Sequence, residues 1–146
     1  MADDLSDPLY RRELLRLAAD AAGAGHLTSP DATASVHNPA CGDRVTVELA
    51  LEEGRIAALA HVTHGCVLTQ ASAALLAGSA LGRDAARLGE LADSVRVFLK
   101  GGPAPQDYEV FDGVIAHAGR HVCVMLPLEA AQKALEAGGL RPDRRC

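Results

Sequence analysis

The sequence contains no tryptophan, and aromatic residues make up only 3% of its 146 residues. Basic residues are also outnumbered by acidic ones, 14 against 19, which gives a formal net charge of −5. A nucleic-acid-binding surface needs cationic side chains for the phosphates, and binding of single strands also uses aromatic side chains for base stacking. We therefore expect no nucleic-acid partner.

Long apolar runs are also lacking, because no segment approaches the roughly 20 consecutive apolar residues of a membrane span. The most apolar stretch, 67–81, is interrupted by polar side chains such as Thr69 and Gln70 and is typical of a buried helix. The first residues are acidic and do not have the cationic and apolar regions of a secretory signal. We expect no membrane association and a cytoplasmic location, where thiols stay reduced.

The length and the 49% of hydrophobic residues are sufficient for one globular domain over 1–146, with a core of about 9–137 and a polar tail at 138–146. Apolar and polar residues alternate over 45–52, which predicts a strand with one buried face. The turn at Glu53-Gly54 and the apolar stretch 56–62 complete a predicted antiparallel hairpin. A further short strand is predicted at 34–37.

Helical spacing of apolar residues marks the remainder of the chain. A first helix is expected from Asp7-Pro8 to the Ala-Gly run at 21–25, and a second from 68 to Gly78 or Gly82. A short helix starting at Asp84, a separate one over 91–99 and a terminal one over 125–137, with Pro127 in its first turn, are expected to follow. Strands early and helices late predict an α+β fold, with helices packed on one face of a small antiparallel sheet.

Four cysteines occur, and no two of them form the CxxC pair of dithiol exchange or the short-spaced pair of a zinc finger. Cys41, Cys66 and Cys123 each lie at a junction between a loop and a predicted element, whereas Cys146 lies in the polar tail and is assigned no role. Asp43 follows Cys41 closely. Three distant thiolates and one carboxylate are able to hold zinc tetrahedrally or to hold an iron–sulfur cluster.

The surroundings of two of these cysteines favour thiolate. Cys66 is predicted to begin a helix, where the macrodipole and the free backbone N–H groups lower a thiol pKa. Cys123 is predicted just ahead of the terminal helix, with Arg120 and His121 as cations that lower its pKa further. His121 and His64 are alternative metal ligands, although such histidines are more often exposed polar side chains near a turn.

Three short segments carry a family resemblance. They are Asn38–Asp43, Gly65-Cys66 with the following Ala71-Ser72, and Arg120–Cys123. Together they resemble the U-type iron–sulfur cluster assembly scaffolds, which are IscU, the amino-terminal domain of NifU, and SufU. The resemblance extends from Leu9 to about Leu135. It implies a small α+β fold in which four side chains converge at one exposed end, namely those of Cys41, Asp43, Cys66 and Cys123.

The chain departs from the IscU pattern at several places. Val122 stands where IscU has a histidine, and the interval between Cys66 and Cys123 is longer, both of which resemble SufU, where zinc can occupy the site. Residues 17–23 do not have the family's His/Tyr and Pro-Arg-Asn segment, so part of its partner surface differs. The Leu-Pro-Pro-Val-Lys motif is absent, and we expect no Hsc-type chaperone partner.

The resemblance implies a SufU-like scaffold that accepts sulfur from a SufS-like cysteine desulfurase and supplies apo iron–sulfur recipient proteins. The expected cargo is zinc, iron or a 2Fe-2S cluster. In this hypothesis Cys123 is the sulfur acceptor, Arg120 supports it, and Asp43 is the labile ligand. A scaffold is expected rather than an enzyme, but sulfurtransferase activity with a desulfurase stays open. The alternatives are a zinc-dependent sulfurtransferase that assembles no cluster, and a structural zinc module for protein contacts.

Overall fold

The computed structural model describes residues 12–40 and 42–138. In this part of the chain, β1 (Ala32–His37), β2 (Arg44–Glu52) and β3 (Arg55–His64) form an antiparallel sheet in the order β1-β2-β3. The main helices are α2 (Arg12–Asp20), which precedes the sheet, and α3 (Val67–Ser79), α4 (Ala85–Leu99) and α5 (His121–Ala137), which follow it. Two 3-10 helices, η2 (Tyr108–Val114) and η3 (Ala118–Arg120), connect α4 to α5.

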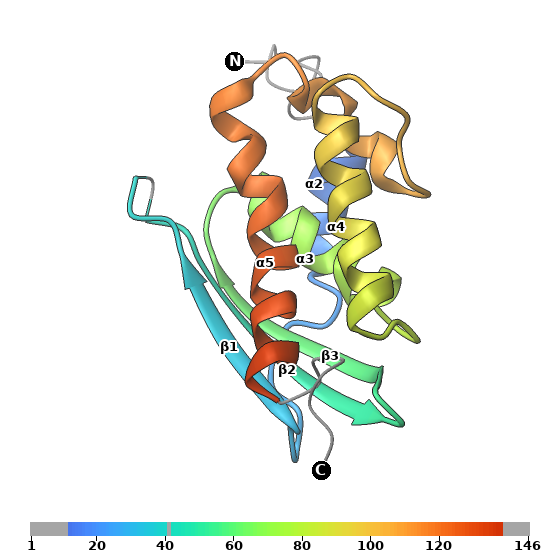
Figure 1. Cartoon of the computed structure of the whole chain (residues 1–146). Coiled ribbons are helices and arrows are strands. Elements are labelled where there is room, and N and C mark those ends of the chain that lie inside the picture. Colours follow the sequence, from blue (N-terminus) through green and yellow to red (C-terminus); the bar gives the residue numbers. More distant parts are fainter. Residues whose placement is uncertain (1–11, 41, 139–146) are drawn as a thin grey trace.

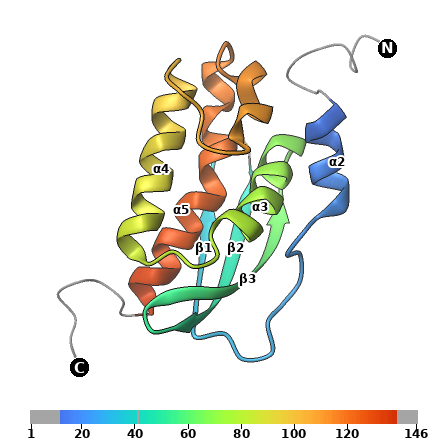
Figure 2. The ribbon, with the colours of Figure 1, turned by 90° about the vertical axis from the view of Figure 1, so that its right-hand side faces the viewer.

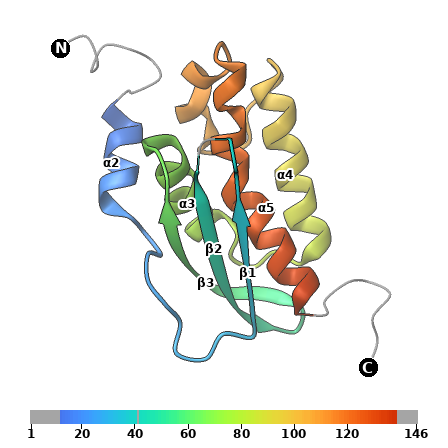
Figure 3. The same ribbon diagram turned by 90° about the vertical axis from the view of Figure 1, so that its left-hand side faces the viewer.

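The helices cover one face of the sheet (Figure 1). Helix α5 packs across β1 and β2, α3 packs against β3 and α5, and α4 forms an outer layer against α5 (Figure 2). The other face of the strands is turned toward the viewer in Figure 3, with the helices behind it. The predicted α+β fold, with helices on one face of a small antiparallel sheet, is confirmed.

The two faces of β2 follow from its sequence alternation. Val45, Val47 and Leu49 are fully buried beneath the helices, whereas Thr46 and Glu48 between them are only partly buried. The predicted strand, its turn and the return strand are confirmed. The pairing places Arg44 opposite His64. Consequently the residues just before β2 and just after β3 lie at the same end of the sheet.

Helix α4 differs from the prediction, which placed a short helix at Asp84 and a separate one over 91–99. It is one continuous helix from Ala85 to Leu99. Asp84 caps it as predicted, because its carboxylate accepts a hydrogen bond from the Arg87 backbone N–H at 2.9 Å. Gly89 does not break the helix, since buried Leu88 and Leu91 on either side continue one apolar face.

The start of α5 is a second correction. The helix begins at His121, earlier than the predicted 125, because it continues directly from the 3-10 turn η3. Cys123 therefore lies within the first turn of α5 and not in a loop ahead of it, and Pro127 lies in the helix interior. Proline has no N–H to donate to the carbonyl four residues back. The carbonyl four residues before Pro127 is that of Cys123, so it receives no helical hydrogen bond from residue 127.

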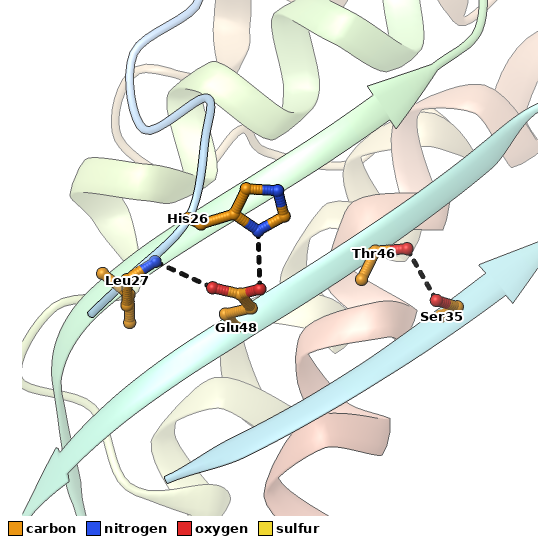
Figure 4. A network of polar contacts seen from close by, with 5 residues as sticks. All are labelled: His26, Leu27, Ser35, Thr46 and Glu48. Carbon is orange, nitrogen blue, oxygen red and sulfur yellow. Dashed lines mark hydrogen bonds and ion pairs between the residues drawn. The ribbon is translucent and has the colours of Figure 1, made fainter. Parts of the chain in front are cut away.

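The linker after α2 is held against the outer face of the sheet by Glu48 (Figure 4). One Glu48 carboxylate oxygen contacts His26 Nδ1 at 2.8 Å, and the other accepts the Leu27 backbone N–H at 2.8 Å. These two hydrogen bonds, the one with His26 first, lower the pKa of Glu48. Ser35 and Thr46 share a hydrogen bond of 2.6 Å between β1 and β2 on the same face.

Several predictions from the sequence lie outside the described residues. These are the start of the first helix at Asp7-Pro8, the position of Cys41, and the polar tail with Cys146. Where the structure describes the chain, no helix is both long enough and apolar enough to cross a bilayer.

Candidate metal centre

Three of the predicted site residues meet at one end of the sheet. Asp43 precedes β2, Cys66 is the N-cap residue of α3, and Cys123 lies in the first turn of α5. One carboxylate oxygen and the two sulfur atoms all lie within 4.8 Å of one another. Asp43 and Cys66 meet because β2 and β3 pair as far as Arg44 and His64. The packing of α5 on the sheet brings Cys123 to them.

Asp43 is a buried carboxylate with a specific partner. Its side chain is 6% exposed, and its Oδ2 accepts a hydrogen bond of 2.6 Å from the Thr69 hydroxyl. Gly65 leaves the room for it, because a Cβ atom at position 65 would lie 2.8 Å from Asp43 Cγ. The backbone carbonyl of Asp43 accepts the Asn38 N–H at 2.8 Å.

Cys66 is the more acidic of the two described thiols. Its pKa is lowered to about 4, chiefly by the hydrogen bond from the Cys123 thiol. The Thr69 backbone N–H and the Arg120 side chain lower it further, against the opposing effect of burial. A thiolate is therefore favoured at Cys66, as the sequence predicted, but the main cause is the Cys123 thiol, and the helix N-terminus contributes through the Thr69 backbone N–H.

The prediction for Cys123 is wrong in direction for the metal-free protein. The pKa of Cys123 is raised, because its thiol donates a hydrogen bond to Cys66, because it is buried, and because a negative charge forms beside it on Cys66. Hydrogen bonding to Arg120 acts in the predicted direction and is outweighed. Cys66 therefore holds the thiolate, and Cys123 holds the proton.

A thiolate titration tests this order of acidity. As the pH falls below about 8.5, the ordinary cysteine pKa, the metal-free protein is expected to approach one thiolate per chain and to keep it until the pH nears the lowered Cys66 value of about 4. The ultraviolet absorbance of thiolates measures it, and Cys66→Ser is expected to remove the signal at neutral pH. A Cys66→Ser protein that keeps the full signal would contradict the assignment.

The two histidines predicted as alternative ligands are placed differently from the three converging groups. His121 Nε2 lies 3.1 Å from the Val114 carbonyl and 3.2 Å from the Ile115 carbonyl, so this nitrogen is bonded to η2 and its end. His64 is exposed at the end of β3. Neither belongs to the described group of Asp43, Cys66 and Cys123.

Sequence reasoning gave no role to three residues that shape the site. Thr69 contacts both Asp43 and Cys66, with its Oγ1 3.5 Å from the Cys66 sulfur. Gly65 provides the space for the carboxylate, and Gln70 donates from Nε2 to the Gly65 carbonyl at 2.9 Å. A hydroxyl three residues after an N-cap cysteine points back toward that cap, which is the signal that could have singled out Thr69.

The donor set suits a thiophilic metal. Two thiolates and a carboxylate at this separation are ligands of tetrahedral zinc and of iron–sulfur clusters, and the sequence predicts Cys41 as the third thiolate. The buried Asp43 carboxylate close to two sulfur atoms fits a site completed by a cation. Fold and site together define a small α+β domain with a candidate metal site formed by cysteine and aspartate side chains.

The comparisons with known proteins agree with this class. Residues 9–111 match the family model described as the NifU-like N terminal domain, and the chain belongs to this family. The match includes Cys41, Asp43 and Cys66 and ends before Cys123, which the fold brings close to Asp43 and Cys66.

Individual relatives give the same result. The chain is 26% identical over 106 residues, 69% of this chain and 67% of the relative, to a protein of Streptococcus pyogenes serotype M1 named "iron-sulfur cluster assembly scaffold protein IscU". The NifU-like protein (N-terminal) of Brucella abortus superposes with a TM-score of 0.84 at 32% identity, over 91% of this chain and 96% of that one. A putative SUF-system scaffold of Fervidobacterium islandicum AW-1 has the same fold, with a TM-score of 0.79 at 20% identity over 89% and 98% of the two chains.

Proposed function

We propose that the protein is an iron–sulfur cluster assembly scaffold of the SufU-like type. The observation that carries the proposal is the convergence of Asp43, Cys66 and Cys123 within 4.8 Å, from three parts of the chain that are far apart in sequence. Membership of the NifU-like family and the likeness to scaffolds of the IscU and SUF systems support it. The cargo would be held by Cys41, Cys66, Cys123 and Asp43.

The sulfur would come from a cysteine desulfurase. In the transfer step a scaffold thiolate attacks the outer sulfur of the desulfurase persulfide, the persulfide S–S bond breaks, and the desulfurase cysteine leaves as a thiolate. Electrons balance without an added oxidant or reductant. The sequence predicted Cys123 as the acceptor, but the low pKa of Cys66 supports Cys66 as the first nucleophile.

Arg120 supports this chemistry by its position. It forms the end of η3 directly before α5, and its hydrogen bonding lowers the pKa of both Cys66 and Cys123. A guanidinium beside two sulfur atoms stabilises negative charge on a bound thiolate or persulfide. We propose that it holds the acceptor sulfur in the anionic form.

A zinc-dependent sulfurtransferase is the second candidate, favoured by the thiolate at Cys66, which a pure relay needs as a nucleophile. Analysis of iron, zinc and acid-labile sulfide after anaerobic purification separates the two. The protein is analysed with and without a desulfurase, cysteine, ferrous iron and a thiol reductant. A scaffold is expected to gain iron and sulfide together.

Zinc retained as the sole metal, with no sulfide, would overturn the scaffold proposal. Desulfurase turnover then distinguishes the remaining possibilities. Stimulation by the zinc form is the result expected of a sulfur relay, and no stimulation is the result expected of a structural zinc module.

A further inference from the structure

Thr69 is a fully buried residue of the first turn of α3 that contacts two proposed ligands at once. Its hydroxyl donates to Asp43 Oδ2 at 2.6 Å, and the hydroxyl oxygen, Thr69 Oγ1, lies 3.5 Å from the Cys66 sulfur. A hydroxyl has one proton. The short hydrogen bond to the carboxylate therefore uses the one donor that Thr69 has.

The carboxylate is restrained on two sides. Gly65 lies against it so closely that a Cβ atom would be 2.8 Å from Cγ, 2.9 Å from Oδ2 and 3.1 Å from Oδ1. Thr69 holds Oδ2. A carboxylate fixed in this way can offer Oδ1 to a metal while Oδ2 stays bonded to the protein, so it binds through one oxygen.

We propose that Thr69 is a positioning residue that fixes Asp43 as a one-oxygen metal ligand. The inference rests on the proposed function only in that it takes Asp43 as a ligand of the cargo. Without the hydroxyl, Asp43 would be a buried carboxylate that has lost its hydrogen-bond donor, and it would leave the ligand position to reach water. Loss of partners that orient metal ligands typically weakens metal binding about 10- to 100-fold.

The same helix provides a matched control. Ser72 is also fully buried, and its hydroxyl donates at 2.6 Å to the carbonyl of Val124 rather than to a proposed ligand. Thr69→Val and Ser72→Ala therefore each remove one buried hydroxyl from α3. If buried hydroxyls act through general stability alone, both variants should affect metal binding alike.

The experiment measures the zinc affinity of the full chain by competition with a chromophoric chelator, with urea unfolding as the folding control. Thr69→Val is expected to bind zinc about 10- to 100-fold more weakly. Thr69→Ser, which restores the hydroxyl, and Ser72→Ala are expected to stay close to the parent. If Thr69→Val does not fold, Thr69→Ala takes its place.

A double-mutant cycle ties the effect to Asp43. In an Asp43→Ala background, Thr69→Val is expected to cause no further loss, because the hydroxyl then has no ligand to position. An equal loss in both backgrounds, or parent affinity in Thr69→Val, would overturn the inference. Failure to assemble a cluster with an intact Thr69 effect on zinc would count against the scaffold proposal alone.

Discussion

Replacing Cys66 with serine is expected to remove the stoichiometric metal. Cys66 is the N-cap residue of α3, and its sulfur lies within 4.8 Å of both an Asp43 carboxylate oxygen and the Cys123 sulfur. Serine keeps the size but has a far less acidic hydroxyl, which is a poor ligand for zinc or iron at neutral pH. Because a four-ligand site that loses one thiolate loses most of its binding free energy, we expect less than a tenth of the parent zinc content after gel filtration.

The fourth cysteine provides the control for this experiment. Cys146→Ser lies outside the predicted site and is expected to keep one metal per chain. Cys41→Ser is expected to behave like Cys66→Ser, which extends the test to a ligand that the structure does not describe. A full equivalent of zinc in either the Cys41 or the Cys66 variant would contradict the ligand assignment.

Gly65→Ala is the second change with a large expected effect. The new Cβ atom would lie 2.8 Å from Asp43 Cγ, closer than nonbonded carbon atoms approach, and Asp43 is buried with its carboxylate bonded to Thr69. Overpacking of this kind costs about 1–3 kcal/mol of folding free energy. Since the carboxylate that must move is a proposed ligand, zinc affinity should fall as well. Urea unfolding and chelator competition measure the two effects.

Gly78→Ala is the matched control, because Gly78 lies in α3 and an added Cβ would meet no atom within 4 Å. Replacing a helical glycine with alanine is expected to stabilise the metal-free protein by about 0.5–1 kcal/mol without changing zinc affinity. If Gly65→Ala matched the parent in both measurements, the steric role of Gly65 would be refuted.

The sheet could be predicted from the sequence because its signals are local. The alternation of Val45, Val47 and Leu49 with polar residues specifies a strand with one buried face, and Glu53-Gly54 marks its turn. The boundaries of the later helices were less predictable. Helix α4 is one helix where two were predicted, and η3 extends α5 backward to His121, an effect of packing that single-residue preferences do not contain.

The candidate site was predictable in its residue types but not in its electrostatics. The family resemblance implied the convergence of Asp43, Cys66 and Cys123, and the structure brings these three side chains together. The order of thiol acidity was not, because it depends on a hydrogen bond between Cys66 and Cys123, which are distant in sequence. The role of Thr69 likewise follows only from its contact with Asp43.

Cluster transfer tests the central claim most directly. The protein would be reconstituted anaerobically with a desulfurase, cysteine, ferrous iron and a reductant, freed of these reagents, and mixed with an apo recipient that binds a 2Fe-2S cluster. Our account predicts that the visible absorption and circular dichroism of a cluster appear on the scaffold first and then pass to the recipient, with matching loss of iron from the scaffold. A scaffold that never acquires cluster absorption, or that retains its cluster in the presence of the recipient, would contradict it.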